Sequence, residues 1–298
     1  MPTPPSLGFV GFGEAAFHIS KGLREAGIEK ITAYDINANS PKLGPRIEQR
    51  ARDTGTTLAP SSADLTAASD LIISTVTANE AIHAAQQTAP VLKGAQVYAD
   101  FNSISPAAKQ EIGRLISEKG GQFVEGAIMA PVPPHGHRVP ILLCGRAAKS
   151  FLARMTPYGM CLEFVGEELG KAAATKMFRS IIVKGLEALI FECVLGASRY
   201  GAEKRVFDSL AETFPGIDWN ALANYMVGRV VVHGERRARE MEEVAETLRS
   251  IDIDPFMAEA TVRRMDWSAE LQLREYFKGV EPKDYHDVLN AIATLARI

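Results

Sequence analysis

The segment SLGFVGFGEAA, residues 6–16, decides the fold of this chain. Its apolar first half predicts a short buried strand, and the run 14–25 predicts a helix. Between them, Gly11, Gly13 and Ala16 stand at the spacing G-x-G-x-x-G/A. In this pattern the first glycine permits a tight turn and the second lets backbone approach a pyrophosphate, while the third small residue lets the helix pack on the strand. The segment therefore predicts a phosphate-binding strand–turn–helix unit.

An acidic residue supports this interpretation. Asp35 follows a second predicted strand, residues 30–36, about 20 residues after the glycines, where a carboxylate binds the adenosine ribose hydroxyls. The predicted dinucleotide site includes Gly11, Phe12, Gly13, Glu14, Ala15 and Asp35. An acid here favours NAD, since it would repel the 2′-phosphate of NADP, but Lys42 and Arg46 lie close enough in sequence to leave NADP open. An ordinary cap or turn role is the alternative for Asp35.

Composition excludes several function classes. The chain has 298 residues, 46% hydrophobic and 23% charged, which is typical of a soluble globular protein with two domains. A net charge of −3 without a basic patch argues against nucleic-acid binding. The three cysteines lack metal-ligand spacing and no signal peptide is visible, which predicts reduced thiols in a cytoplasmic protein. The apolar stretch 177–197 carries four charged residues, so no membrane span is expected.

Strand-like and helix-like segments alternate through the first half. Further buried strands are predicted at residues 71–76, 96–100, 122–129 and 139–144, with helices between most of them. Such alternation predicts an α/β fold in which a doubly wound, mostly parallel sheet is covered on both faces. After Gly166 helical periodicity dominates, beginning with one long helix over residues 170–200. We therefore expect a Rossmann domain at 1–166 and an all-helical substrate and dimerisation domain at 167–298, with the long helix between them.

The long predicted helix carries a polar stripe. Lys176, Ser180, Lys184 and Glu187 are spaced by four, four and three residues, so they share one helix face. A partly desolvated lysine has a lowered pKa and suits proton transfer. From periodicity alone, a solvated face with an exposed Lys184–Glu187 pair is the alternative.

Four segments, in chain order, resemble the β-hydroxyacid dehydrogenase superfamily, which includes 6-phosphogluconate and 3-hydroxyisobutyrate dehydrogenases. GFVGFGEAA at 8–16 resembles its cofactor signature, and DFNSISP at 100–106 resembles its D-x-S-T-x-x-P segment beside the nicotinamide. FVEGAIMAPV at 123–132 stands in the place of its substrate-binding strand. Residues 166–180 resemble its G-x-x-G-x-G-x-x-x-K-x-x-x-N motif, whose lysine is the catalytic acid/base. The chain looks closest to a branch described as 6-phosphogluconate-dehydrogenase-like.

The resemblance implies a homodimeric, NAD-dependent oxidoreductase. It assigns the acid/base role to Lys176, and Ser180 stands where the family has asparagine, so these two are the predicted catalytic residues. The predicted cofactor-binding set is completed by Thr75, Val76, Asn102 and Ser103. The expected reaction is hydride transfer between nicotinamide and a hydroxyl-bearing substrate, with a hydroxy acid as the expected class.

The chain departs from the family at the substrate turn. The family sequence Ser-Gly-Gly aligns with residues 129–131, Met-Ala-Pro, which lack the hydroxyl and one N–H. The predicted substrate-binding residues are Met129, His135, His137, Arg138 and Arg237. An arginine can fork onto a carboxylate or phosphate. Ordinary loop histidines or a His-x-His metal site remain alternatives, as does a structural ion pair for Arg237, and we expect no metal.

Two other functions stay open at this stage. The altered substrate turn is compatible with reduction of an imine or a bulky ketone. A non-catalytic dinucleotide sensor on the same fold is the alternative function that is not enzymatic. The lysine at position 176 favours an enzyme over a sensor.

Overall fold

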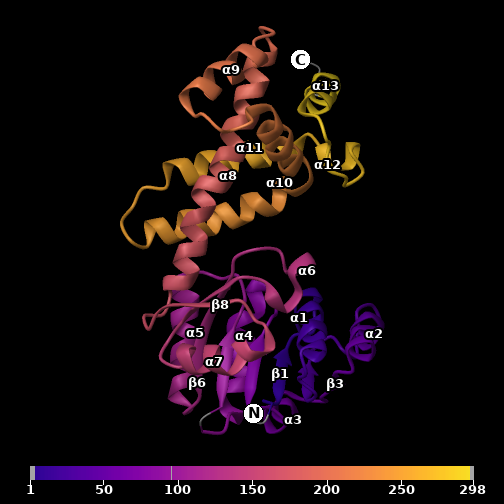
Figure 1. Ribbon diagram of the computed structural model, residues 1–298, viewed down its shortest axis with the longest axis vertical. Helices are drawn as coiled ribbons and strands as arrows, with labels where there is room; N and C mark the ends of the chain where they lie inside the picture. The colour runs from indigo at the N-terminus through magenta and orange to yellow at the C-terminus, as the bar shows by residue number, and fades with distance from the viewer. Residues whose placement is uncertain (1–3, 95, 296–298) are drawn as a thin grey trace. The chain divides into compact units, whose positions relative to one another are not determined.

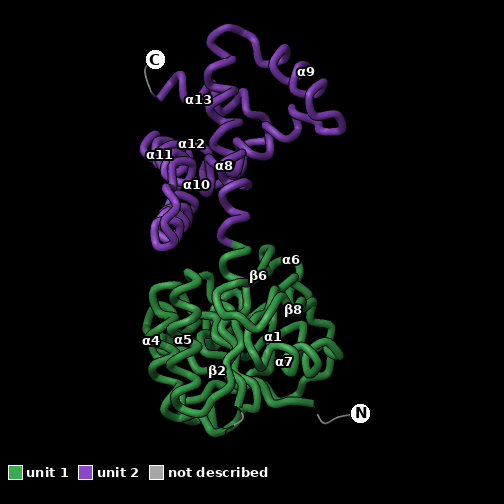
Figure 2. Tube along the Cα trace, turned by 90° about the vertical axis from the view of Figure 1, so that its left-hand side faces the viewer, with its two compact units in different colours: residues 1–176 green, residues 177–298 purple. Residues whose placement is uncertain are grey.

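The computed structural model describes residues 4–94 and 96–295. The chain forms two compact units, residues 1–176 and 177–298 (Figure 2). The division falls inside helix α8 (Lys171–Ser198), whereas the sequence pattern predicts it at Gly166, where the last strand ends. The long helix predicted over residues 170–200 is confirmed.

Unit 1 is built on one eight-stranded sheet of order β3-β2-β1-β4-β5-β6-β7-β8 (Figure 1). The strands are β1 (Leu7–Val10), β2 (Ile31–Tyr34), β3 (Thr57–Leu58), β4 (Leu71–Ser74), β5 (Val97–Asp100), β6 (Gln122–Ile128), β7 (Ile141–Cys144) and β8 (Leu162–Gly166). Neighbouring strands run parallel except β6 and β7, which are antiparallel. The predicted doubly wound, mostly parallel sheet is therefore confirmed.

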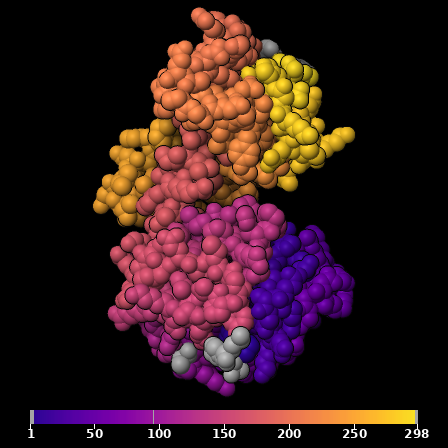
Figure 3. Space-filling model, viewed as in Figure 1, coloured from indigo at the N-terminus to yellow at the C-terminus, as the bar shows by residue number. Residues whose placement is uncertain are grey.

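Helices cover both faces of this sheet. They are α1 (Glu14–Glu25), α2 (Gly44–Thr54), α3 (Ser62–Ala67), α4 (Ala81–Thr88), α5 (Pro106–Glu118), α6 (Val132–His135) and α7 (Ala148–Met155), with short 3-10 turns η1 (Ala78–Glu80), η2 (Ala89–Val91), η3 (Gly136–Arg138) and η4 (Thr156–Tyr158). Phe9 and Ile73 belong to one apolar core, and their neighbours Val10 and Ile72 belong to another. Adjacent strand residues point to opposite faces, so both faces are buried. Helix α2 exposes its outer side at the surface of unit 1, in indigo (Figure 3).

Helices are the only regular secondary structure among the described residues of unit 2. After α8 come α9 (Glu203–Thr213), α10 (Trp219–Arg249), α11 (Phe256–Glu270), α12 (Leu273–Tyr276) and α13 (Tyr285–Leu295). The second half of α10 turns one face inward, because Arg237, Met241 and Val244 are buried. Within residues 4–94 and 96–295, no helix is both long enough and apolar enough to cross a membrane.

Candidate active site

The glycine turn is fixed by steric constraints. Gly11 has a φ of +82°, and a Cβ there would lie 2.7 Å from Cγ1 of Val76 and 2.8 Å from the carbonyl oxygen of Thr75. Only glycine fits such a position. Gly13 precedes α1, and a Cβ there would meet nothing within 4 Å, so this residue borders open space. The turn therefore brings bare backbone to the edge of a cavity.

This cavity has a volume of about 370 Å³. Among the residues predicted to bind the cofactor, its lining includes Gly11, Gly13, Glu14, Ala15, Asp35, Thr75 and Val76. Helix α1 begins at this cavity without a side-chain cap, so its first N–H groups remain available to a phosphate. The bare glycine backbone and the uncapped helix end fit the pyrophosphate of a dinucleotide.

Asp35 is held at the cavity by two backbone bonds. The N–H of Phe12 donates to Oδ2 at 2.8 Å, and the N–H of Asn37 donates to Oδ1 at 2.9 Å. Each carboxylate oxygen can accept a further bond, as a ribose diol requires. The Asn37 bond is also the turn contact that the sequence left open as an alternative. The side chain of Phe12 is fully buried in the core, so only the backbone of this residue takes part in the site.

Cationic groups on α2 lie near this carboxylate. Burial lowers the pKa of Arg50, and the charge of Arg46 lowers it further, whereas Glu14 and Asp35 oppose the shift. Glu14 and Asp35 both line the cavity, so the charges of its wall act on this guanidinium.

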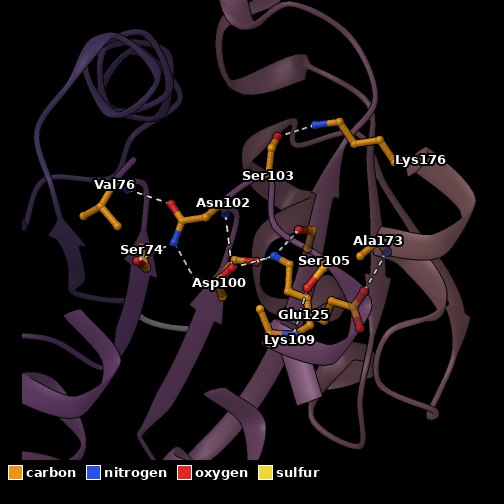
Figure 4. Close-up of polar contacts among 12 residues, drawn as sticks. Ser74, Val76, Asp100, Asn102, Ser103, Ser105, Lys109, Glu125, Ala173 and Lys176 are labelled. Atoms are coloured by element: carbon orange, nitrogen blue, oxygen red, sulfur yellow. Dashed lines mark hydrogen bonds and ion pairs between the residues drawn. The ribbon is translucent and has the colours of Figure 1, made fainter. Parts of the chain in front are cut away.

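A hydrogen-bond network organises the segment after β5 (Figure 4). The Asn102 side chain accepts from the N–H of Val76 at 2.7 Å and donates to Ser74 Oγ at 3.0 Å. Its Nδ2 also donates to Oδ2 of Asp100 at 2.6 Å. Asn102 therefore ties the carboxyl ends of β4 and β5 together, and it holds the backbone of Val76, which lines the cavity.

A buried ion pair lies under this network. Lys109 of α5 is 1% exposed, and its Nζ donates to Oδ1 of Asp100 at 2.5 Å. The same Nζ donates to the carbonyl oxygens of Asp100 at 2.8 Å and Gly126 at 3.0 Å. Sequence reasoning missed this pair, because a lysine in a helix is solvated far more often than it is buried.

The side chains of Lys176 and Ser103 meet near the carboxyl end of β5. The Nζ of Lys176 donates to Ser103 Oγ at 2.5 Å (Figure 4). Glu125 of β6 fixes the start of α8, because its carboxylate accepts the N–H of Gly170 at 2.5 Å and that of Ala173 at 2.7 Å. Burial raises the pKa of Glu125, and these two bonds oppose the rise. A carboxylate at a helix N terminus is stabilising, so β6 anchors the helix that carries Lys176.

The two charged residues that follow Lys176 in the polar stripe on α8 make ion pairs within unit 2. Lys184 Nζ lies 2.6 Å from Oε2 of Glu240, and Arg237 donates to the carboxylate of buried Glu187 at 2.5 and 2.6 Å. The exposed Lys184–Glu187 pair that the sequence left open is therefore not formed. Burial raises the pKa of Glu187, and Arg237 opposes this rise. Ser180, half-buried, lies one helical turn after Lys176.

The predicted substrate loop packs against α1. His137 is buried against Gly22 of α1, and burial together with the charge of Arg138 lowers the pKa of His137. This position gives His137 a packing role, whereas His135 and Arg138 are exposed. Met129 is half-buried and donates its N–H to the carbonyl oxygen of Pro140 at 2.9 Å. Within the described part of the chain, no three His, Cys, Asp or Glu side chains are grouped to hold a metal ion.

The packing of His137 can be tested at Gly22. A Cβ at this position would lie 1.9 Å from Nδ1 of His137, so Gly22→Ala is expected to destabilise the protein by about 1–3 kcal/mol through overpacking. Urea unfolding measures the change. Gly196→Ala, at a helical glycine with open space around it, is the control and is expected to be neutral or stabilising. If Gly22→Ala left the free energy of unfolding unchanged, the imidazole of His137 would not be held against Gly22.

Comparison with protein families identifies both halves of the chain. The NAD binding domain of 6-phosphogluconate dehydrogenase matches residues 6–132, and a domain of unknown function, DUF1932, matches residues 197–268. The first match contains the glycine turn, Asp35 and the Asn102 network.

Known relatives match between 72% and 99% of this chain. A conserved hypothetical protein of Sinorhizobium meliloti 1021 is 36% identical, with a TM-score of 0.85 over 99% of this chain and 97% of that one. Conserved protein MTH1747 of unknown function, described as structurally similar to 3-hydroxyacid dehydrogenases, is 34% identical, with a TM-score of 0.77 over 90% of this chain and 99% of that one. The mitochondrial 3-hydroxyisobutyrate dehydrogenase of Drosophila melanogaster is 23% identical over 72% of this chain and 65% of that protein.

Proposed function

This chain belongs to the β-hydroxyacid dehydrogenase superfamily, and we propose that it transfers a hydride between a hydroxyl-bearing substrate and NAD, with Lys176 as acid/base. The observation that carries the proposal is the bond from Lys176 Nζ to Ser103 Oγ, beside the network of Asn102. This bond would place a proton-transfer group at the carboxyl ends of the parallel strands, where the glycine turn also lies. A hydroxy acid is the proposed substrate class.

The protein's own groups would divide the work as follows. The cavity at Gly11 and Gly13 holds the dinucleotide, whose nicotinamide accepts or returns the hydride when bound. During oxidation, neutral Lys176 takes the hydroxyl proton of the substrate while the C–H hydrogen leaves as hydride; during reduction the ammonium returns that proton. Ser103 Oγ accepts a hydrogen bond from Nζ and so positions the amine.

Substrate contacts are assigned by exposure and chemistry. Arg138 is exposed and can bind a carboxylate or phosphate with two parallel bonds, with His135 as a second donor from the same loop. Ser180, half-buried one turn beyond Lys176, would orient the reacting hydroxyl. Arg237 is left out of this assignment because its guanidinium is buried on Glu187. We further propose that the helical unit supports a homodimer and that the protein acts in the cytoplasm.

The activity is tested by a substrate screen. Purified protein is incubated with NAD or NADP and a panel of small hydroxy acids, and formation of the reduced nicotinamide is followed by absorbance. Turnover of a hydroxy acid is expected. Oxidation of the reduced cofactor with imines alone would replace the proposal by imine reduction. Tight cofactor binding without turnover in either direction would support a dinucleotide sensor instead.

Cofactor preference is tested at Asp35. Its carboxylate is expected to accept both ribose hydroxyls, and this charged contact is expected to contribute about 1.5–3 kcal/mol in total, so Asp35→Ala should weaken NAD binding about 10- to 100-fold. NADP should lose less, because the 2′-phosphate is no longer repelled. Titration calorimetry with both cofactors measures the change. The control is Asp53→Ala, at an exposed residue of α2. Equal or tighter NADP binding by the wild type would contradict the assignment.

A further inference from the structure

Two buried carboxylates lie side by side on neighbouring strands of unit 1. Asp100 of β5 and Glu125 of β6 are paired in register, and both residues are 0% exposed. Paired residues of parallel strands point to the same face of the sheet, so the two carboxylates share one buried region (Figure 4). The Nζ of Lys109 joins the strands, because it bonds Asp100 and the carbonyl oxygen of Gly126. Burying two acids beside one cation is costly, so each carboxylate needs further hydrogen bonds.

The Asp100 carboxylate finds these bonds in the segment that follows β5. It accepts the backbone N–H of Asn102 at 3.2 Å and the side-chain amide of the same residue at 2.6 Å. Ser103 is the next residue along the chain. Asp100 therefore fixes the segment that carries the hydroxyl bonded to Lys176.

The Glu125 carboxylate finds its bonds at the first turn of α8. Its Oε2 accepts the N–H of Gly170 at 2.5 Å, and its Oε1 accepts the N–H of Ala173 at 2.7 Å. Residues three apart on a helix are neighbours, so Lys176 follows Ala173 on the adjoining turn. A displacement of the first turn would therefore move the amine of Lys176 away from its partner.

We propose that Glu125 is the positioning residue of Lys176: its carboxylate fixes the first turn of α8 and so holds the amine at Ser103 Oγ for proton transfer. The inference rests on the proposed function, in which Lys176 is the acid/base. Glu125 does not meet the substrate in this role, because its side chain is fully buried. The two neighbouring strands thus hold the two partners of one bond, with Asp100 on the side of Ser103 and Glu125 on the side of Lys176.

A carboxylate suits this position better than a neutral group of the same shape. Both bonds come from backbone N–H groups, which only donate, so each oxygen has to accept. A glutamine amide has a single oxygen, and its NH₂ would face the second N–H. Negative charge is also favourable at the N terminus of a helix. Glu125→Gln therefore keeps the volume of the side chain and disturbs the first turn of α8.

The test compares the full-length wild type with Glu125→Gln by kinetics and by NMR spectroscopy. In the variant, kcat is expected to fall about 10- to 100-fold because the acid/base is misplaced, while KM and the Kd for NAD stay close to wild type. For NMR the lysines carry ¹³C at Cε, and the Lys176 signal is the one that Lys176→Arg removes. Ser103→Ala shows where this signal lies without the bond, and Glu125→Gln is expected to shift it toward that position.

Two further variants make the test specific. Glu125→Asp keeps the charge and both acceptor oxygens, so its kcat and its Lys176 signal should lie between those of wild type and Glu125→Gln. If Glu125→Gln does not fold, as judged by circular dichroism, Glu125→Asp carries the test against wild type. Glu168→Gln is the matched control, because it removes the same charge from an exposed residue just before α8 and should change neither readout.

Wild-type kcat and a wild-type Lys176 signal in the Glu125 variants would overturn the inference, and so would an equal loss in Glu168→Gln. The NMR readout needs no substrate, so it separates this inference from the proposed function. If no substrate is turned over but the signal shifts in Glu125→Gln, the enzymatic function fails and the placement of the amine by Glu125 stands. If turnover is found and the signal does not shift, the positioning role alone fails.

Discussion

Lys176→Ala is expected to lower kcat by about 10²- to 10⁴-fold, because it removes the group that exchanges a proton with the substrate hydroxyl. Lys176 is half-buried, and its Nζ bonds Ser103 at the surface of the sheet edge, so its loss should leave the fold and the Kd for NAD nearly unchanged. Lys176→Arg should lose almost as much turnover, since a guanidinium holds its proton too tightly to act as a base. Steady-state kinetics with a substrate from the screen, together with calorimetry for NAD, measure both effects.

Two other lysines of α8 serve as controls. Lys171→Ala changes an exposed residue near the start of the helix, and turnover should survive. Lys184→Ala breaks the ion pair with Glu240, so it is expected to lower stability more than kcat. Near-normal kcat in Lys176→Ala would show that the acid/base lies elsewhere, with the exposed His135 as the next candidate.

Lys109→Met is expected to destabilise unit 1 by about 3–5 kcal/mol, because it leaves the fully buried carboxylate of Asp100 without its cation. The same carboxylate holds Asn102, so NAD binding at the adjoining cavity should weaken as well. Urea unfolding followed by circular dichroism gives the stability change. Calorimetry at low temperature, where the variant stays folded, gives the Kd.

Two further variants test whether the loss of stability comes from leaving the Asp100 carboxylate unpaired rather than from removing any cation of α5. Arg114→Met removes an exposed cation further along α5 and is expected to leave the unfolding midpoint nearly unchanged. The double variant Lys109→Met/Asp100→Asn removes both buried charges and should recover much of the lost stability. A single variant as stable as wild type, or a double variant as unstable as the single one, would contradict the importance of this ion pair.

The local half of the nucleotide site was predictable. The strand lies in the apolar first half of SLGFVGFGEAA, at Leu7–Val10, and the helix has the predicted bounds, Glu14–Glu25. A tight turn with a positive φ at Gly11 depends on neighbouring residues alone, and buried apolar runs identify the central strands. The parallel sheet followed from their alternation with helices.

The direction of β7 and the existence of the edge strand β8 could not be predicted from local sequence. β8 (Leu162–Gly166) was missed because it is only partly buried and contains exposed Glu163, so it lacks an apolar run. β7 (Ile141–Cys144) was located, but its antiparallel direction was not foreseen. The hydrophobicity of a strand does not encode the direction of its neighbour, which depends on the path of the connecting chain.

The sequence by itself determined the fold class, the family and the motif that contains Lys176. Only the tertiary structure decided what surrounds that lysine: Ser103 at its amine, Glu125 at the start of its helix, and Lys109 under the network. It also decided that Arg237 and His137, equally polar in the sequence, are buried against Glu187 and Gly22. The reason is physical. A turn or a helix is specified by adjacent residues, whereas the burial and pairing of a polar side chain depend on partners that folding brings from distant parts of the chain.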